Sequence, residues 1–211
     1  MSAAPPSIAA ATQPTGKAES ILAAARRTFL ASGYGAASMD AIAREAGASK
    51  ATVYAYFASK EELFGAVVAR DSERYAAEFL GSELDPLDAE ASLRAIAERF
   101  LRLLLSPDVI ALNRTIIGEV TRFPELAEVF WREGPERIRV QVEGFLRRAT
   151  AAGSLDIADP RLAAGQFASL VRGEIHLRTL FGLGAETRDD AVSTAAANAV
   201  ATFLRAFGVR R

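Results

Sequence analysis

The sequence contains no cysteine and only one histidine, His176, among its 211 residues. Without cysteine the chain can form no disulfide, use no thiol nucleophile and build no cysteine-based zinc site. A single histidine excludes a metal site with several histidine ligands. The sequence also lacks a glycine-rich phosphate loop and a serine nucleophile elbow, so it gives little support to an enzyme and implies no metal and no cofactor.

Long apolar runs are missing as well. No segment approaches the roughly 18 uninterrupted apolar residues that cross a bilayer, and the N-terminal stretch lacks the features of a secretory signal. We therefore expect a cytoplasmic protein with no membrane partner. Half of the residues are hydrophobic and 24% are charged, which is ordinary for a soluble globular protein with a substantial core.

The net charge of −1 is small, but the charges are unevenly distributed. Between residues 17 and 60 the sequence has six basic and three acidic side chains, a local excess of three positive charges, so the rest of the chain carries a net −4. A basic end on an acidic body is typical of a protein that binds nucleic acid with one part only.

Helical periodicity runs through most of the chain, without a convincing alternating strand, and predicts an all-α fold. Residues 1–16 have three prolines and no charged side chain, and we expect a disordered tail there. A small head is expected over 17–63, a linker helix continuing to about residue 80, and a larger helical domain over 81–211. Its helices are predicted over 87–105, 107–123, 124–133, 135–152, 160–181 and 187–207.

Residues 38–63, SMDAIAREAGASKATVYAYFASKEEL, carry the most specific pattern. Met39, Ile42 and Ala46 form one apolar helical face, Gly47 can supply a left-handed turn, and Ser49 can cap a second helix. In that second helix, Val53 and Phe57 are expected to point inward. The side chains left to face outward are those of Lys50, Thr52, Tyr54 and Tyr56.

With the preceding AARRTFLASGYGAA, this segment resembles the DNA-binding domain of the TetR family of bacterial transcription regulators. The resemblance implies a three-helix helix-turn-helix head that binds double-stranded DNA. It implies phosphate contacts by Ser38, Thr52, Tyr54 and Lys60. It implies contacts with base edges by Lys50, Ala51 and Tyr56.

The stretch RTIIGEVTRFPELAEVFWREGPERI, residues 114–138, resembles the regulatory domain of the AefR-like branch of the same family. Family members hold a small-molecule effector between the helices that follow the linker helix. Bulky or polar candidates on inward faces are Phe100, Leu104, Asn113, Ile117, Phe123, Phe130, Trp131, Phe167, Arg172 and His176. Each could instead belong to an ordinary core, and His176 could pack in a core or a dimer interface.

The family generally forms homodimers through its last two helices, and the resemblance implies the same here. In the last helix, Ala195, Ala197 and Ala201 keep the surface thin, which lets helices approach closely. The apolar face of this helix could equally pack within the chain. That face consists of Val192, Ala196, Ala199, Val200, Phe203 and Phe207.

The sequence thus predicts a dimeric, ligand-responsive repressor that a small molecule releases from a palindromic operator. The alternative is a helical small-molecule-binding or scaffold protein that reads no DNA sequence, and an enzyme is a more distant third. Salt-dependent binding to duplex DNA would separate the first two.

Overall fold

The computed structural model describes residues 16–79, 84–183 and 189–209, without the side chains of residues 75–79. These residues form helices joined by short turns, and the one β-bridge among them, between Leu155 and Gly208, is isolated. The all-α prediction is confirmed. The tail expected over 1–16 lies outside the described residues except for Gly16, and so does the first half, 81–83, of the predicted boundary at 81–86.

The described helices follow one another along the chain with few intervening residues. They are α1 (Gly16–Ala36), α2 (Met39–Glu45), α3 (Lys50–Tyr56), α4 (Lys60–Phe79), α5 (Ala89–Leu105), α6 (Pro107–Glu119), α7 (Pro124–Glu133), α8 (Pro135–Ala151), α9 (Pro160–Leu180) and α10 (Asp189–Phe207).

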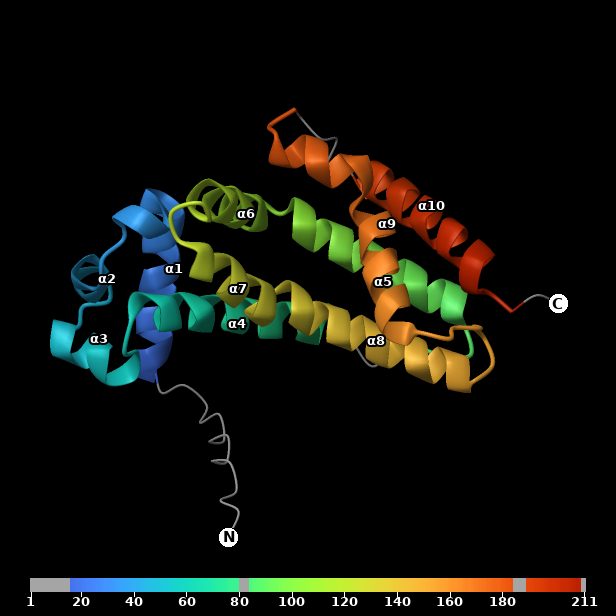
Figure 1. The fold of residues 1–211 in the computed structure, drawn as a ribbon, viewed down its shortest axis with the longest axis horizontal. Coiled ribbons are helices and arrows are strands. Elements are labelled where there is room, and N and C mark those ends of the chain that lie inside the picture. Colours follow the sequence, from blue (N-terminus) through green and yellow to red (C-terminus); the bar gives the residue numbers. More distant parts are fainter. Residues whose placement is uncertain (1–15, 80–83, 184–188, 210–211) are drawn as a thin grey trace, which may run out of the picture.

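The head, formed by α1, α2, α3 and the start of α4, lies at one end of the elongated molecule (Figure 1). Its core is aromatic at the centre: the Phe64 ring packs edge-on against Phe29 and Tyr34, with centroids 5.4 Å away in both pairs. Ile116 of α6 and Leu126 of α7 belong to the same buried cluster. The head therefore shares its core with the helices that follow it.

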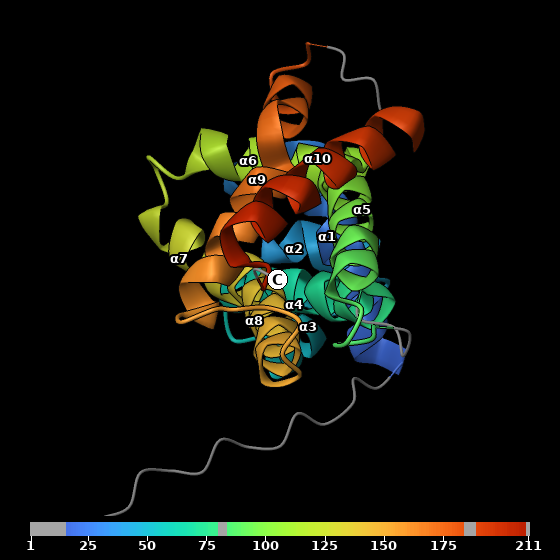
Figure 2. The ribbon, with the colours of Figure 1, turned by 90° about the vertical axis from the view of Figure 1, so that its right-hand side faces the viewer.

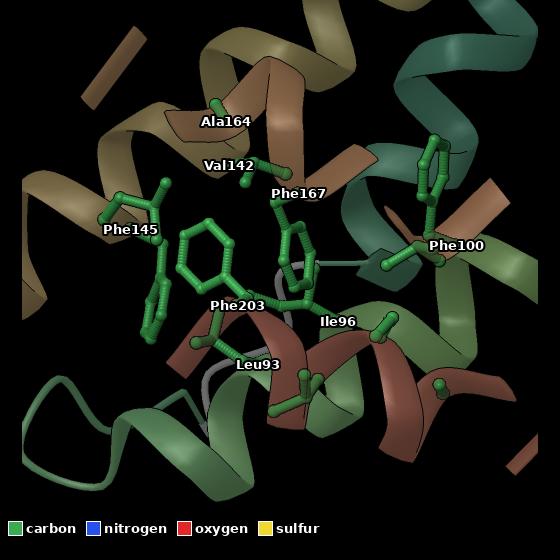
Figure 3. Close-up of a cluster of buried hydrophobic side chains, with 14 of the residues drawn as sticks. Leu93, Ile96, Phe100, Val142, Phe145, Ala164, Phe167 and Phe203 are labelled. Atoms are coloured by element: carbon green, nitrogen blue, oxygen red, sulfur yellow. The ribbon is translucent and has the colours of Figure 1, made fainter. Parts of the chain in front are cut away.

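The rest of the molecule has its own core, between α5, α8, α9 and α10. Seen along the long axis, α10 crosses over α9 and α5 (Figure 2). Phe167 of α9 and Phe203 of α10 are fully buried there, with ring centroids 5.2 Å apart (Figure 3). Rings of this size bury a large apolar area, so this pair contributes strongly to the hydrophobic stabilisation of the body.

The structure corrects two of the predicted helices. The helix expected over 107–123 ends at Glu119, because Phe123 precedes Pro124 and is held outside the α region, at φ −131° and ψ 75°. The helix expected over 160–181 is broken at Gly173, whose φ of 49° and ψ of −162° no α-helix contains. Periodicity did not reveal this break, because the apolar spacing continues across it.

The predicted apolar face of α10 packs inside the chain. Val192, Ala196 and Phe203 are buried against α5 and α9. This apolar face is therefore used within the chain, and the predicted pairing of two copies through their last two helices would need other residues. No described helix has both the length and the apolar character needed to cross a bilayer.

Candidate nucleic-acid interface and effector cavity

The helix-turn-helix is built by two serine caps and one glycine; the sequence predicts the cap at Ser49 and the turn at Gly47, and the structure adds the cap at Ser38. The Ser38 hydroxyl accepts from the Ala41 N–H at 3.1 Å, and the Ser49 hydroxyl accepts from the Thr52 N–H at 3.0 Å. Gly47 between the helices has φ 56°, in the left-handed region. The capped turn, together with the buried Val53 and Phe57, orients α3.

The outer face of α3 carries the side chains predicted to meet DNA. Val53 is fully buried, whereas Tyr54 and Tyr56 are 44% and 41% exposed. Ala51 is exposed and Thr52 is partly exposed. The positions suit a DNA-reading surface, and the contacts themselves stay a prediction.

Lys50 forms an ion pair with Asp40 of α2, with Nζ 2.9 Å from Oδ1. The hydrogen bond and the charge of Asp40 raise the pKa of Lys50, so the ammonium is charged at neutral pH. Exposed pairs of this kind contribute little to stability. Breaking the contact with Asp40 therefore costs little free energy, and the Lys50 ammonium could donate to the edge of a guanine instead.

Lys60 has an internal role that the sequence did not reveal. Its ammonium donates to the carbonyl oxygens of Tyr34, at 2.8 Å, and Ala37, at 3.1 Å, and lies 4.3 Å from the centre of the Tyr34 ring. An ammonium has three N–H donors, so one remains for a phosphate. The predicted phosphate contact is still possible, beside a structural role in the head.

Arg26 of α1 joins the head to the body. Its guanidinium bonds Asp71 of α4 at 2.7 Å and Asp108 of α6 at 2.8 Å. Burial acts to lower the pKa of Arg26, but the hydrogen bonds that it donates to both carboxylates, together with their negative charge, raise the pKa overall. The three side chains tie α1, α4 and α6 together.

A second junction lies where α6 ends. The Glu119 carboxylate accepts from the backbone N–H of Gly35 at 2.9 Å. A Cβ on Gly35 would lie 3.0 Å from each carboxylate oxygen, closer than atoms normally approach. The nearby Gly33 has φ 77° and turns the end of α1 toward α6. Small residues here are what allow the contact.

A cavity of about 1410 Å³ lies between the head and the body and is lined by α1 and by α4 to α10. All but one of the predicted effector-binding residues line it, and that they bind an effector stays a prediction. Ile117 and Trp131 are 60% and 55% exposed, so they lie where the cavity opens. The predicted residues that line it are Phe100, Leu104, Asn113, Ile117, Phe130, Trp131, Phe167, Arg172 and His176.

The prediction for Phe123 is corrected. Its ring packs edge-on against Tyr34 in the head, with centroids 5.3 Å apart, and it does not line the cavity. The reason is the early end of α6: the turn over residues 120–123 carries this ring back onto α1. Phe123 therefore belongs to the junction between head and body.

Arg172 and His176 are two of the polar residues of α9 that line this mostly apolar space, beside Arg161, Gln166 and Ser169. Burial lowers the pKa of both, and the charge of Arg172 lowers the pKa of His176 further. His176 is therefore neutral at neutral pH. Across the described part of the chain no cluster of His, Cys, Asp or Glu side chains could hold a metal ion.

Comparison with known families matches both parts of the chain. Residues 21–67 match "Bacterial regulatory proteins, tetR family", and residues 91–209 match "AefR-like transcriptional repressor, C-terminal domain". The transcriptional regulator SrpR of Pseudomonas putida is 27% identical over 157 residues, which cover 74% of this chain and 72% of SrpR.

Solved structures of full length are similar as well. The Flavonoid-responsive Regulator FrrA is 38% identical with a TM-score of 0.78, over 92% of this chain and 98% of that chain. A TetR-family regulator from Mesorhizobium loti is 29% identical with a TM-score of 0.77, over 92% of this chain and 97% of that chain.

Proposed function

Since the chain belongs to the TetR family of bacterial transcription regulators and carries an AefR-like C-terminal domain, we propose that it is a ligand-responsive repressor. As a homodimer it would place its two heads in successive major grooves of a palindromic operator, as helix-turn-helix dimers do. A small molecule in the cavity would release it from that operator.

The observation that carries this proposal is that the cavity is lined by the helices that hold the head. Phe29 of α1 and Phe64 of α4 belong to the head core and also line the cavity. α6 lines the cavity in its middle and contacts the head through Asp108 and Glu119. A molecule that fits the cavity better in one arrangement of these helices shifts the population toward that arrangement.

The relatives support the same direction. SrpR is by name a transcriptional regulator, and FrrA is by name a flavonoid-responsive regulator. FrrA aligns along 92% of this chain, cavity-lining helices included. Planar aromatic molecules are therefore sensible first compounds for a release assay.

Exposed apolar side chains on α9 support the dimer. Leu170 before the break at Gly173, Leu177 after it and Phe181 at the C-terminal cap are 38%, 52% and 72% exposed. Leu177→Glu is expected to produce monomers in sedimentation velocity experiments, because a buried charge would oppose association. Leu87→Glu, at a still more exposed leucine (73%) outside α9 and α10, should leave the dimer intact.

The deciding experiment is selection of genomic DNA fragments by the purified full chain, followed by titration of the recovered site at several salt concentrations. We expect a palindrome bound about 1000-fold or more tightly than unrelated duplex. Weak binding that ignores sequence would contradict the operator proposal. It would favour a helical small-molecule-binding protein instead.

A further inference from the structure

Most of the charged side chains that line the cavity form ion pairs with one another. Arg26 is held by Asp71 and Asp108, and Arg139 and Arg161 both bond Glu136. Among the described residues, Arg172 is the cavity-lining arginine that has no carboxylate within ion-pair distance. The remaining acid of the lining, Asp159, caps α9 by accepting from the Leu162 N–H at 3.1 Å.

Two nitrogen atoms at this place are buried without a hydrogen-bond partner. Among the described residues they are Nε of Arg172 and Nε2 of His176, four residues apart in the sequence and on either side of the break at Gly173. Buried nitrogen atoms of charged or polar side chains nearly always have partners, because desolvation without a hydrogen bond is unfavourable. Because both residues line the same cavity, these two atoms point to a ligand that forms the missing hydrogen bonds.

The surroundings restrict what that ligand can be. The apolar walls nearby, which include Phe100, Leu104 and Phe167, favour an apolar body. A cationic ligand would be repelled by the Arg172 guanidinium, and a purely apolar one would leave both nitrogen atoms unsatisfied. A guanidinium matches the two oxygen atoms of an anion through parallel hydrogen bonds.

We infer that the cavity takes an apolar molecule carrying one anionic oxygen group, a carboxylate or an ionised phenol, which Arg172 binds as the charged donor and His176 assists. The inference rests on the proposed function in treating the cavity as the effector site. Arg172 precedes and His176 follows the break at Gly173. One anion held by both side chains would thus connect the two segments of α9.

Calorimetric titration of the full chain with matched naphthalene compounds tests this directly. The probes are 2-naphthoate, the neutral naphthalene-2-carboxamide, and 2,4-dinitro-1-naphtholate as an ionised phenol. We expect at least one of the two anions to bind wild-type protein about ten-fold or more tightly than the carboxamide. Which anion binds better tells whether the natural group is a carboxylate or a phenolate. Equal affinity of all three would overturn the inference.

Two variants test whether Arg172 causes the preference for anions over the carboxamide. Arg172→Met should reduce the ratio of anion to carboxamide affinity to near one. Arg161→Met is the matched control, because Arg161 lines the same cavity but is 67% exposed in its side chain and paired with Glu136. It should keep the wild-type ratio. An equal loss in both variants would mean a general attraction of anions and would contradict a site at Arg172.

A third variant keeps the charge at position 172 so that misfolding is less of a concern, and a fourth tests whether His176 contributes to anion binding. Arg172→Lys keeps the positive charge without the guanidinium geometry and should lower the anion preference, whereas an unchanged preference would contradict the assignment. His176→Phe should weaken the anion more than the carboxamide. Since no DNA is present, loss of the anion preference and failure to bind an operator are separate results.

Discussion

Lys60 shows how a single side chain can serve two parts of the head. It begins α4, yet its ammonium donates to two carbonyl oxygens at the end of α1 and beyond it, Tyr34 and Ala37. The Tyr34 hydroxyl in turn donates to Glu61 at 2.8 Å, and burial together with this carboxylate raises the pKa of Tyr34. Residues 34–37 and the first turn of α4 are thus joined by side-chain contacts.

We predict that Lys60→Ala lowers the free energy of unfolding by about 1–3 kcal/mol, because two hydrogen bonds to a charged donor are lost in a half-buried place. Lys50→Ala is the control. Its ion pair is exposed, so the expected change is within about 0.5 kcal/mol. Urea denaturation followed by circular dichroism measures both.

The same two variants separate structural from DNA-binding roles. In folded protein, each phosphate contact removed should flatten the dependence of log affinity on log salt by about 0.9. If Lys60→Ala lowers stability but leaves this slope unchanged, Lys60 is structural only. A loss at particular base pairs on Lys50→Ala would support its predicted contact with a base edge.

At the scale of elements, α9 contributes most to the candidate effector site, and its break defines that site. Gly173 has φ 49° and ψ −162°, a combination that residues with a side chain rarely adopt. A Cβ added there would meet nothing within 4 Å. The obstacle to substitution is therefore the backbone and not the neighbours. The break also sets the direction in which His176 faces relative to Arg172.

Gly173→Ala should therefore destabilise the protein by about 1–3 kcal/mol. The matched control is Gly165→Ala on the same helix. At Gly165 an added Cβ meets nothing within 4 Å and φ is not positive, so this substitution should stabilise α9 by up to about 1 kcal/mol. Thermal unfolding of the two variants compares them. Equal effects would mean that the break at Gly173 is not required in solution.

At the scale of the whole molecule, head and body form one packed unit. The head core includes side chains from α6 and α7, and two polar junctions, at Arg26 and at Glu119, connect the same helices. Because the packed core resists gradual deformation, a shift of α6 must be accommodated at the head. A change in the cavity that shifts α6 would therefore change the packing of the head that carries the DNA-binding face.

We predict strong coupling between Gly35 and Glu119 in a double-mutant cycle. Gly35→Ala alone should destabilise the protein, because its Cβ would press on the Glu119 carboxylate. In a Glu119→Ala background the same change should be much less harmful, with an interaction energy of about 0.5–3 kcal/mol. Additive effects would mean that the two chain segments are not in contact in solution.

Gly118→Ala supplies the control for this cycle, since a Cβ there meets nothing within 4 Å. It should show little effect alone and little coupling to Gly35→Ala. Measured with operator DNA, the Gly35→Ala variant should change the affinity and the response to effector together. A change in neither would contradict a role for this junction in communication.

The sequence by itself determined the features that depend on neighbours in the chain. The cap at Ser49, the turn at Gly47 and the inward position of Val53 follow from hydrogen bonds and packing within one or two turns. The same local logic placed most helices. It failed where a single residue decides the backbone, at Gly173 and ahead of Pro124.

Only the tertiary structure decided which side chains meet across the chain. Arg26 finds Asp71 and Asp108 at separations of 45 and 82 residues, and Gly35 finds Glu119 at 84. For the same reason Phe123 packs against Tyr34 in the head and does not line the predicted pocket. Arg172, for its part, has no carboxylate within ion-pair distance among the described residues. Such pairings depend on how whole helices pack, which no local pattern of residues specifies.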